Sequence, residues 1–410
     1  MSRYTPRLIH VSRLDDIVSE IGSLGFRPDQ AEVVSCGLWY RLVRVDGLDH
    51  GLAERIQKVV QASGGMAVFS ARQAADETAV DMLLAASQSG LTAIASDPGL
   101  RSGPLRDLSE SLSEVLQFES TPHTLTLKGK VFDLSQRTHI MGVLNITPDS
   151  FSDGGRYWDH AQAVEQARRM IDEGADIIDV GGESTRPGAT PVSADEELCR
   201  IIPVIEEIAA DAGVLVSVDT MKAVVAKQAL AAGAAMINDV SSLSRDPSLA
   251  EVVAESGVPI VLMHMRGTPQ TMQQCTAYED LMGEICDYLR RRMEYAEKAG
   301  IRREQIVIDP GIGFGKSLER GNLTILRNLA ELRSLGRPIL IGPSRKGFLG
   351  QIVGRPAHDR AEATAGAVAA AVMNGADLVR VHDVGMMKQV VAVIDAIKRA
   401  APVKTVKSEK

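Results

Sequence analysis

The sequence predicts a (β/α)8 barrel preceded by a small α/β accessory domain. From Ile140 onward, short β-branched runs alternate with longer amphipathic stretches rich in Ala, Glu and Arg. Eight such units fit in about 270 residues, the usual size of this barrel. The short runs are almost continuously apolar, as parallel strands covered on both faces are. A doubly wound open sheet would show the same alternation, but the count of eight and the placement of polar residues favour the barrel.

The eight predicted strands come in a regular order along the chain. They are Ile140–Ile146, Asp176–Gly182, Leu215–Asp219, Ala235–Val240, Pro259–Met265, Gln305–Asp309, Pro338–Gly342 and Leu378–Asp383. The clearest helices between them are Ala161–Glu173, Glu196–Ala210, Lys222–Ala232 and Tyr278–Lys298. Many helices are followed by a glycine, which takes the left-handed conformation that ends a helix at little cost. These glycines are Gly174, Gly213, Gly233, Gly257, Gly300, Gly336 and Gly375.

The first part of the chain has a different pattern, without a catalytic cluster before residue 139. It predicts helices at Leu14–Leu24, Gly51–Ser63, Asp76–Gln88 and Leu105–Phe118, and strands at Met66–Ser70 and Leu91–Ser96, with Trp39–Val45 as the candidate for a third strand. Asp97-Pro98-Gly99 is a turn signal. We therefore expect an accessory α/β domain over residues 1–120 and a linker with a short hairpin over 121–138. The barrel then covers 139–402 and a flexible tail 403–410.

Composition excludes several classes of function. The 410 residues carry a net charge of -8 and a pI of about 5.6, which disfavours general binding to nucleic acid or to acidic membranes. No apolar run approaches the roughly 20 residues that span a bilayer, and no signal peptide is expected at the N-terminus. Four cysteines without CxxC spacing predict reduced thiols in a cytoplasmic protein, with neither a disulfide framework nor a zinc site. They are Cys36, Cys199, Cys275 and Cys286.

Polar residues gather at the C-terminal end of nearly every predicted strand. In a barrel these ends meet at one mouth, where active sites lie. Any one of the residues could be purely structural, but a set at the same end of so many strands indicates a site. The set is Asn145, Gly181–Glu183, Asp219, Asn238, His264, Asp309, Ser344–Lys346 and His382.

Three of these groups fit a flat heterocycle with an amino-pyrimidinone edge. Asp219 and Asp309 offer carboxylate acceptors, and the Asn238 amide both donates and accepts hydrogen bonds. A buried carboxylate that faces paired N–H groups stays ionised and well satisfied. The alternative is that the three side chains bond to each other or to backbone N–H groups.

Other residues at the same ends suit an anion. Asn145 offers an amide oxygen suited to Mg²⁺, although one neutral ligand holds the cation only if a diphosphate brings it. Thr185 and Arg186 lie in a Gly-rich loop after the second strand and can meet an anion. The loops after strands seven and eight often form a phosphate site in barrels, which favours anion binding there. The residues at this place are Lys346, Arg380 and His382, of which the last two lie two apart on one strand and face the same side.

The segment Asp309-Pro-Gly-Ile-Gly-Phe-Gly-Lys-Ser317 looks like a nucleotide-binding loop but does not fit the pattern. A phosphate-binding loop needs glycine where Pro310 stands, and it opens a βαβ unit rather than lying within a barrel series. ATP binding is therefore not expected. Met263 and Met265 could wall an aromatic pocket or simply pack the barrel, and packing is the safer interpretation for Met265. Glu183 and Asp383 lie near the mouth without a clear chemical role.

At these residues the chain resembles the dihydropteroate synthases, the folate-pathway enzymes that sulfonamides target. The matching motifs follow in the family's order over residues 139–400. They are Met141-Gly-Val-Leu-Asn-Ile-Thr-Pro-Asp-Ser-Phe-Ser-Asp-Gly-Gly155, Asp179-Val-Gly-Gly-Glu-Ser-Thr-Arg-Pro-Gly188, Ser217-Val-Asp-Thr220, Ile237-Asn-Asp-Val240, Leu262-Met-His-Met265, Asp309-Pro-Gly-Ile-Gly-Phe-Gly-Lys316, Ser344-Arg-Lys-Gly-Phe348 and Arg380-Val-His-Asp383.

The resemblance implies a role for each matching residue. Asp219, Asn238, Asp309, Lys346 and Met263 would bind the pterin. Asn145, Thr185, Arg186, Arg380 and His382 would bind the diphosphate, with Mg²⁺ at Asn145. Phe151, Pro187, Phe314 and Ser344 would build the p-aminobenzoate pocket, which the loops carrying Asp153 and Arg186 close. The family also implies a homodimer.

The implied reaction is condensation of 6-hydroxymethyl-7,8-dihydropterin diphosphate with p-aminobenzoate. Mg²⁺, Arg380 and His382 would stabilise the charge that develops on the leaving diphosphate. Asp153 is the candidate to stabilise a pterin cation, and Lys346 completes the catalytic set. An arylamine is nucleophilic at neutral pH, so no strong general base is needed. Whether ionisation precedes attack is left open by the sequence.

Two rival functions use the same features differently. A pterin-dependent methyltransferase on the same barrel would share the acids but would have no use for cations arranged for a diphosphate. A pterin-binding protein without activity would need a broken motif, and none is found. Many members of the family begin near the position of Ile140. Residues 1–120 are therefore interpreted as a domain that stabilises or assembles the enzyme, with fusion to a second folate enzyme as the alternative.

Overall fold

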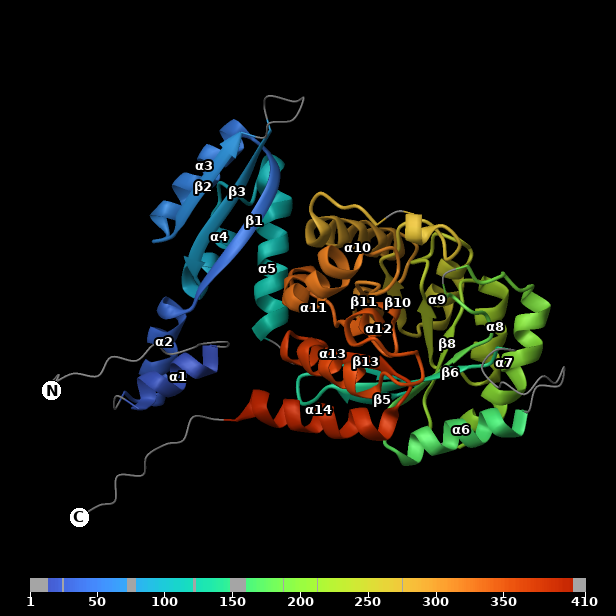
Figure 1. Ribbon diagram of the computed structural model, residues 1–410. Coiled ribbons are helices and arrows are strands. Elements are labelled where there is room, and N and C mark those ends of the chain that lie inside the picture. Colours follow the sequence, from blue (N-terminus) through green and yellow to red (C-terminus); the bar gives the residue numbers. More distant parts are fainter. Residues whose placement is uncertain are drawn as a thin grey trace, which may run out of the picture. The chain divides into compact units, whose positions relative to one another are not determined.

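The computed structural model describes residues 14–23, 26–71, 79–120, 123–147, 160–186, 188–211, 213–274 and 276–400 (Figure 1). Contacts within the chain divide it into two compact units. The first unit reaches Ser120, and the second runs from Thr121 to Lys398. In the described part of the chain, no helix combines the length and the apolar character that crossing a membrane requires.

The second unit is the predicted barrel. Its sheet has eight parallel strands in the order β11-β10-β9-β8-β7-β6-β13-β12, and a parallel bridge between Ile308 and Ile339 joins the two ends. The strands are β6 (His139–Asn145), β7 (Ile177–Gly181), β8 (Val216–Asp219), β9 (Met236–Asp239), β10 (Ile260–Met263), β11 (Ile306–Asp309), β12 (Leu340–Ile341) and β13 (Leu378–Val381). All eight predicted strands are therefore present, and the prediction of a (β/α)8 barrel is confirmed.

Helices follow the strands and cover the barrel. They are α6 (His160–Asp172), α7 (Ala194–Ala209), α8 (Ala223–Ala232), α9 (Leu249–Ser256), α10 (Leu281–Lys298), α11 (Thr324–Asn328), α12 (Gly347–Val353), α13 (Ala361–Met373) and α14 (Val384–Arg399). Short turns of tighter or wider helix complete this layer at η2 (Met272–Gln274), η3 (Arg303–Gln305), η4 (Leu318–Leu323) and η5 (Leu329–Leu335). Gly233 and Gly257 end α8 and α9 in the left-handed conformation, as predicted, whereas Gly213 does not adopt it.

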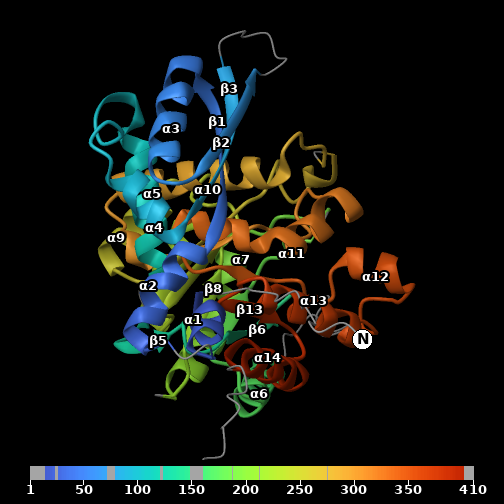
Figure 2. The same ribbon diagram turned by 90° about the vertical axis from the view of Figure 1, so that its left-hand side faces the viewer.

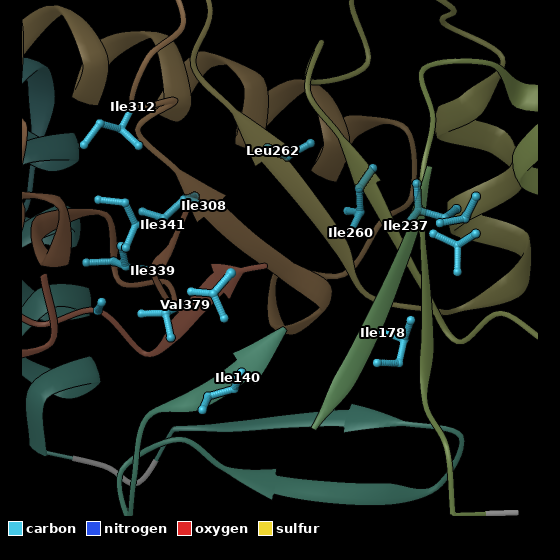
Figure 3. Close-up of a cluster of buried hydrophobic side chains, with 14 of the residues drawn as sticks. Ile140, Ile178, Ile237, Ile260, Leu262, Ile308, Ile312, Ile339, Ile341 and Val379 are labelled. Carbon is cyan, nitrogen blue, oxygen red and sulfur yellow. The ribbon is translucent and has the colours of Figure 1, made fainter. Parts of the chain in front are cut away.

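Residues that alternate along the strands pack into two different hydrophobic clusters. Ile140, Ile178, Ile237, Ile308 and Val379 pack in one buried cluster with the surrounding helices (Figure 3). Their strand neighbours form a second cluster inside the barrel, with Met141, Ile177, Met236, Val307 and Leu378 among its members. Because both faces of every strand are buried, the strands read as continuous apolar runs.

A hairpin joins this inner cluster. Strands β4 (Thr124–Leu127) and β5 (Lys130–Asp133) pair antiparallel around Lys128 and Gly129, which both have positive φ, as tight hairpin turns require. Leu125, Leu127 and Phe132 are buried against residues near the N-terminal ends of the barrel strands. The hairpin therefore packs within the barrel unit, at the end opposite the predicted site.

The first unit has a three-stranded sheet in the order β1-β3-β2, and both strand pairs are antiparallel. Its elements are α1 (Leu14–Ser23), α2 (Pro28–Leu38), β1 (Tyr40–Asp49), α3 (His50–Ala62), β2 (Met66–Ala71), β3 (Ala79–Ser87), α4 (Gln88–Ser96), η1 (Gly103–Leu105) and α5 (Arg106–Ser120). Figure 2 shows α3, α4 and α5 on one side of this sheet, where Ile56, Leu84 and Ile94 belong to the unit's core.

Two predictions for this unit are wrong. Residues 79–87 of the predicted helix Asp76–Gln88 form strand β3, because their alternate residues Val80, Met82, Leu84 and Ala86 are buried and the segment pairs with both neighbouring strands. Composition favoured a helix, but sheet pairing overrides propensity.

The predicted strand Leu91–Ser96 lies instead within helix α4, which begins after Ser87, whose hydroxyl accepts the Gly90 N–H. Helix α2, with Pro28 in its first turn, was not predicted.

Candidate active site

The predicted polar residues lie together at the C-terminal end of the barrel. The strand register puts Asn145 beside Gly181, Gly181 beside Asp219, and Asp219 beside Asn238. Asp309 ends β11, Arg380 lies on β13, and His382 follows that strand directly. Parallel strands thus bring residues far apart in sequence into one layer.

Arg380 links this layer to Asp179, a carboxylate outside the predicted set of site residues. Its Nε donates to Asp179 Oδ2 at 2.6 Å, and its Nη2 donates to Asp219 Oδ2 at 2.8 Å. Asn238 Nδ2 donates to the same Asp179 oxygen at 2.9 Å. Asp179 is fully buried and orients both side chains through these hydrogen bonds. The signal for it was a charged residue inside an apolar strand.

Burial makes the two predicted pterin carboxylates weak acids. The pKa of Asp219 is raised to about 7 because burial penalises its charge, although Arg380 acts in the opposite direction. The pKa of Asp309 is raised to about 6 by burial, against its hydrogen bond from the Gly311 N–H at 2.7 Å. Each group can therefore change protonation near neutral pH. Asp219, Asn238 and Asp309 do not bond to one another; each is held by a different neighbour.

A buried lysine holds the loop after β11. Lys316 Nζ lies 2.8 Å from His264 Nδ1, 2.9 Å from the His264 carbonyl oxygen and 2.9 Å from the Gly311 carbonyl oxygen. Only 4% of Lys316 is exposed, and burial lowers its pKa well below the usual value. Gly311 has a φ of 67°, and a Cβ there would overlap the His264 carbonyl oxygen. Lys316, the lysine of the segment that looks like a nucleotide-binding loop, therefore acts as an internal brace that ties this loop to His264.

The same loop supplies an aromatic ring to the site. Asn322 is buried and accepts the Gly313 N–H at 2.6 Å, while its Nδ2 donates to the Lys316 and Ser317 carbonyls. This fixes Phe314 so that the Lys346 ammonium lies 4.1 Å from its ring centroid. Burial and the charge of Arg380 lower the pKa of Lys346 to about 8.

Lys346 stands on a strained turn. Arg345 has a φ of 56°, a conformation that costs a non-glycine residue free energy. Its guanidinium pairs with Asp383 through two contacts of 3.0 and 2.5 Å, and Arg360 Nη1 donates to the Arg345 and Lys346 carbonyls. These contacts stabilise the turn, and they give Asp383 the role that the sequence left open.

His382 is oriented by Ser344. The Ser344 hydroxyl oxygen accepts the His382 backbone N–H at 3.1 Å and lies 2.9 Å from His382 Nδ1. Burial and the charges of Arg380 and Arg345 lower the pKa of His382 to about 3, so the ring is neutral at physiological pH. If the hydroxyl donates to Nδ1, the ring proton lies on Nε2, which can then donate to an anion.

The loop after β7 is anchored by a second lysine. Lys222 Nζ lies 2.5 Å from a carboxylate oxygen of both Glu183 and Glu197. Glu197 is buried, which raises its pKa. Beyond this anchor Thr185 is half-buried and Arg186 is exposed, and the charge of Arg186 lowers the pKa of both Lys346 and His382. Glu183 thus fixes the base of the loop that carries the predicted anion-binding pair.

Methionines line one side of the mouth. Met263, Met272, Val240 and Phe314 form a small buried cluster with Met221 and Met265 packed against it. Phe151, Asp153 and Pro187 lie outside the described residues. No cluster of three or more His, Cys, Asp or Glu side chains able to hold a metal occurs among the described residues.

The features at the barrel mouth define the class of the protein. They combine the apolar methionine cluster with the buried acids Asp219 and Asp309, the Asn238 amide and the turn that carries Lys346. The family model described as pterin binding enzyme matches residues 141–382. The site therefore belongs to a pterin-binding barrel enzyme.

Comparison with individual proteins narrows this class. A curated dihydropteroate synthase from Synechocystis is 48% identical over 279 residues, which span 68% of this chain and 96% of that protein. The structure of the Yersinia pestis dihydropteroate synthase with a sulfonamide drug superposes with a TM-score of 0.65 at 43% identity. That of the Xanthomonas albilineans enzyme with 4-aminobenzoic acid gives 0.64 at 43% identity. Each covers 68% of this chain and 100% of its own. The chain belongs to the dihydropteroate synthases, transferases of folate biosynthesis.

Proposed function

We propose that the barrel condenses 6-hydroxymethyl-7,8-dihydropterin diphosphate with p-aminobenzoate, releasing 7,8-dihydropteroate and diphosphate. The observation that carries the proposal is the layer at the mouth, where Asp219 and Asn238 lie beside Arg380, with Asp309 and Lys346 around them. The bound 4-aminobenzoic acid of the Xanthomonas albilineans relative supports the second substrate.

The pterin end is served by the buried acids. As carboxylates, Asp219 and Asp309 would accept N–H groups of the amino-pyrimidinone ring, and Asn238 would keep its carbonyl oxygen for a further donor because Asp179 takes its amide N–H. Met263 offers an apolar surface to the flat ring. Loss of bulk water makes each of these hydrogen bonds stronger than it would be at the surface.

The diphosphate end needs N–H donors that can reach its anionic oxygens. His382 donates from Nε2 as a neutral ring, and Arg380 retains N–H groups beyond the two that bind Asp179 and Asp219. Thr185 and Arg186 would add contacts from the loop after β7.

The chemistry at Asn145 fits a hard cation only in part, because one amide oxygen supplies one ligand. Mg²⁺ held by Asn145 and the diphosphate would neutralise charge on the leaving group.

The carbon–oxygen bond to the diphosphate breaks, and the arylamine nitrogen forms the new bond to the pterin methylene and then loses a proton. Lys346 and Phe314 would place p-aminobenzoate, with the ring of Phe314 fixed by the loop after β11. Asp153 and Phe151, together with Pro187 and Ser344, complete the proposed set. A homodimer is a further proposal that rests on the resemblance to the family.

The direct test supplies the purified chain with both substrates and Mg²⁺ and follows dihydropteroate and diphosphate. Equal release of the two products, lost on chelation and in Asp219→Ala, is expected. A folded chain that binds the pterin but makes no product would favour the methyltransferase or the inactive binding protein instead.

A further inference from the structure

The sheet of the first unit has one face that helices cover and one that they do not. On the covered face, alternate residues of β3 are buried in the unit's core. On the other face, the register places Leu42, Ala85 and Met66 in one row and Arg44, Leu83 and Val68 in the next. We call the apolar residues of this face, with Tyr40 at its end, the open sheet face (Tyr40, Leu42, Met66, Val68, Leu83 and Ala85).

The open sheet face is strongly apolar for a surface. Leu42 is 71% exposed, Met66 70% and Val68 57%, and Tyr40 and Leu83 are also exposed. Strands with one face in water normally alternate apolar with polar residues. Here Met66 and Val68 of β2 and Leu83 and Ala85 of β3 make much of the outer face apolar as well, as in strands that are packed on both sides.

The charged side chains Arg44, Asp46 and Asp81 of this face lie on β1 and on the central strand β3, where they pair with one another. Arg44 Nε donates to Asp46 Oδ1 at 2.7 Å, and Asp81 Oδ1 accepts the Gly47 N–H at 2.9 Å. Arg44 and Asp81 also lie within 3.9 Å of each other. Arg44 is thus shared between Asp46 and Asp81, and the three side chains leave one excess negative charge beside the apolar residues.

We propose that the open sheet face is a self-association surface, which packs against the same face of a second copy of this chain. The exposed side chains offer roughly 600 Å² per copy, so two copies would bury roughly 1,200 Å², the lower end of the range for specific interfaces. An identical sheet has the same twist, and sheets of equal twist pack face to face. The proposal is independent of the reaction at the barrel.

The test measures how fast a cysteine on this face reacts with a maleimide at increasing chain concentration. In Leu83→Cys, placed on the central strand, labelling is expected to slow several-fold as the chain rises through the micromolar range, because a modest interface of this size saturates there. In Val131→Cys, on a hairpin residue that is 62% exposed, the rate stays constant. Peptide mapping separates these sites from the native cysteines.

Three further substitutions keep the test decisive. Leu42→Cys repeats the measurement if Leu83→Cys folds poorly, and adding Val68→Asp to the cysteine variant is expected to remove the concentration dependence. Val131→Asp is the matched control and leaves it intact. Two outcomes would overturn the proposal. A labelling rate that is fast at every concentration would mean that the face is free. A rate that is slow at every concentration would mean that the face is covered within its own chain.

Discussion

At the scale of single residues, the site is built from charges that have been taken out of water. Arg380 between Asp179 and Asp219 is the clearest case, because each partner would be costly to bury alone. Lys316 is another: as an ammonium it donates to three acceptors, and as an amine it donates to two carbonyls and accepts from His264 Nδ1. Either protonation state satisfies every contact, so the brace persists across neutral pH.

Replacing Lys316 tests this brace. Lys316→Met keeps the aliphatic chain but leaves two buried carbonyls and one ring nitrogen unpaired. The loss is expected to be about 2–4 kcal/mol of unfolding free energy, since each unsatisfied buried group costs about 1–3 kcal/mol. The KM for p-aminobenzoate should rise more than that for the pterin, because Phe314 shifts with the loop. Urea unfolding and steady-state kinetics measure both effects.

The control for this change is Lys227→Met, at an exposed lysine on α8. It is expected to alter neither stability nor KM. Wild-type stability in Lys316→Met would show that the contacts around its amine are dispensable.

Protonation of the acids predicts how pterin binding depends on pH. The pKa values of Asp219 and Asp309 are raised to about 7 and about 6, so both become carboxylates as pH rises through this window. Pterin affinity should therefore increase from pH 5 through pH 7, by at most about tenfold per unit for each group, and level off about one unit above the pKa of Asp219. Titration calorimetry with the pterin checks this, and Asp219→Asn should remove the upper part of the rise.

The same raised pKa values predict the opposite pH dependence for the folding stability of the free protein, which should decrease as pH rises. A raised pKa in the folded state means that folding binds protons, so these groups stabilise the fold at low pH. That contribution falls as pH rises through about 6 and 7.

The proposed role of the carboxylates in pterin binding would be contradicted by a pterin affinity that declines across pH 5–7.

At the scale of elements, each loop of the site is fixed by a contact from outside the loop. Asn322 holds the loop after β11, Asp383 holds the turn before Lys346, and Lys222 holds the loop after β7. The hairpin of β4 and β5 serves the opposite end of the barrel, where Phe132 is buried and makes an edge contact with His139 at 5.0 Å between ring centroids. Catalytic and stabilising elements are thus separated along the barrel axis.

Truncating the hairpin's aromatic side chain separates these two roles. Phe132→Ala is expected to lower the unfolding free energy by about 3–5 kcal/mol, because it leaves a cavity among the strand ends. The rate per folded molecule should stay at the wild-type value, since the site lies at the other end. Val131→Ala, on the exposed neighbour, should change stability by no more than about 0.5 kcal/mol. A lower kcat in Phe132→Ala would argue against this separation.

At the scale of the whole molecule, the two units have separate cores. Every site residue that the structure describes lies in the barrel unit, and the first unit contributes its own core around Ile56 and Ile94. A chain beginning at Thr121 lacks the open sheet face but is expected to keep the wild-type kcat and KM. Kinetics compared with the full chain check this, and a large loss of rate would show that the first unit supports the site.

Much of the barrel could be predicted from the sequence because its signals are local. Parallel strands buried on both faces must be apolar throughout, and their polar ends must converge, so the strand positions and the mouth residues from Asn145 to His382 followed from pattern and resemblance. The first unit was harder. Its segment 79–87 has the composition of a helix, and only pairing with two neighbouring strands makes it a strand.

The sequence by itself determined the barrel, the family and the residues that gather at the mouth. Tertiary structure alone decided what those residues do to one another: that Asp179 orients Arg380 and Asn238, that Lys316 turns inward to His264, and that His382 is neutral beside Ser344. The physical reason is that charge states and hydrogen-bond partners depend on burial and on distances between separate strands. Neither burial nor the distance between separate strands can be predicted from the local sequence pattern.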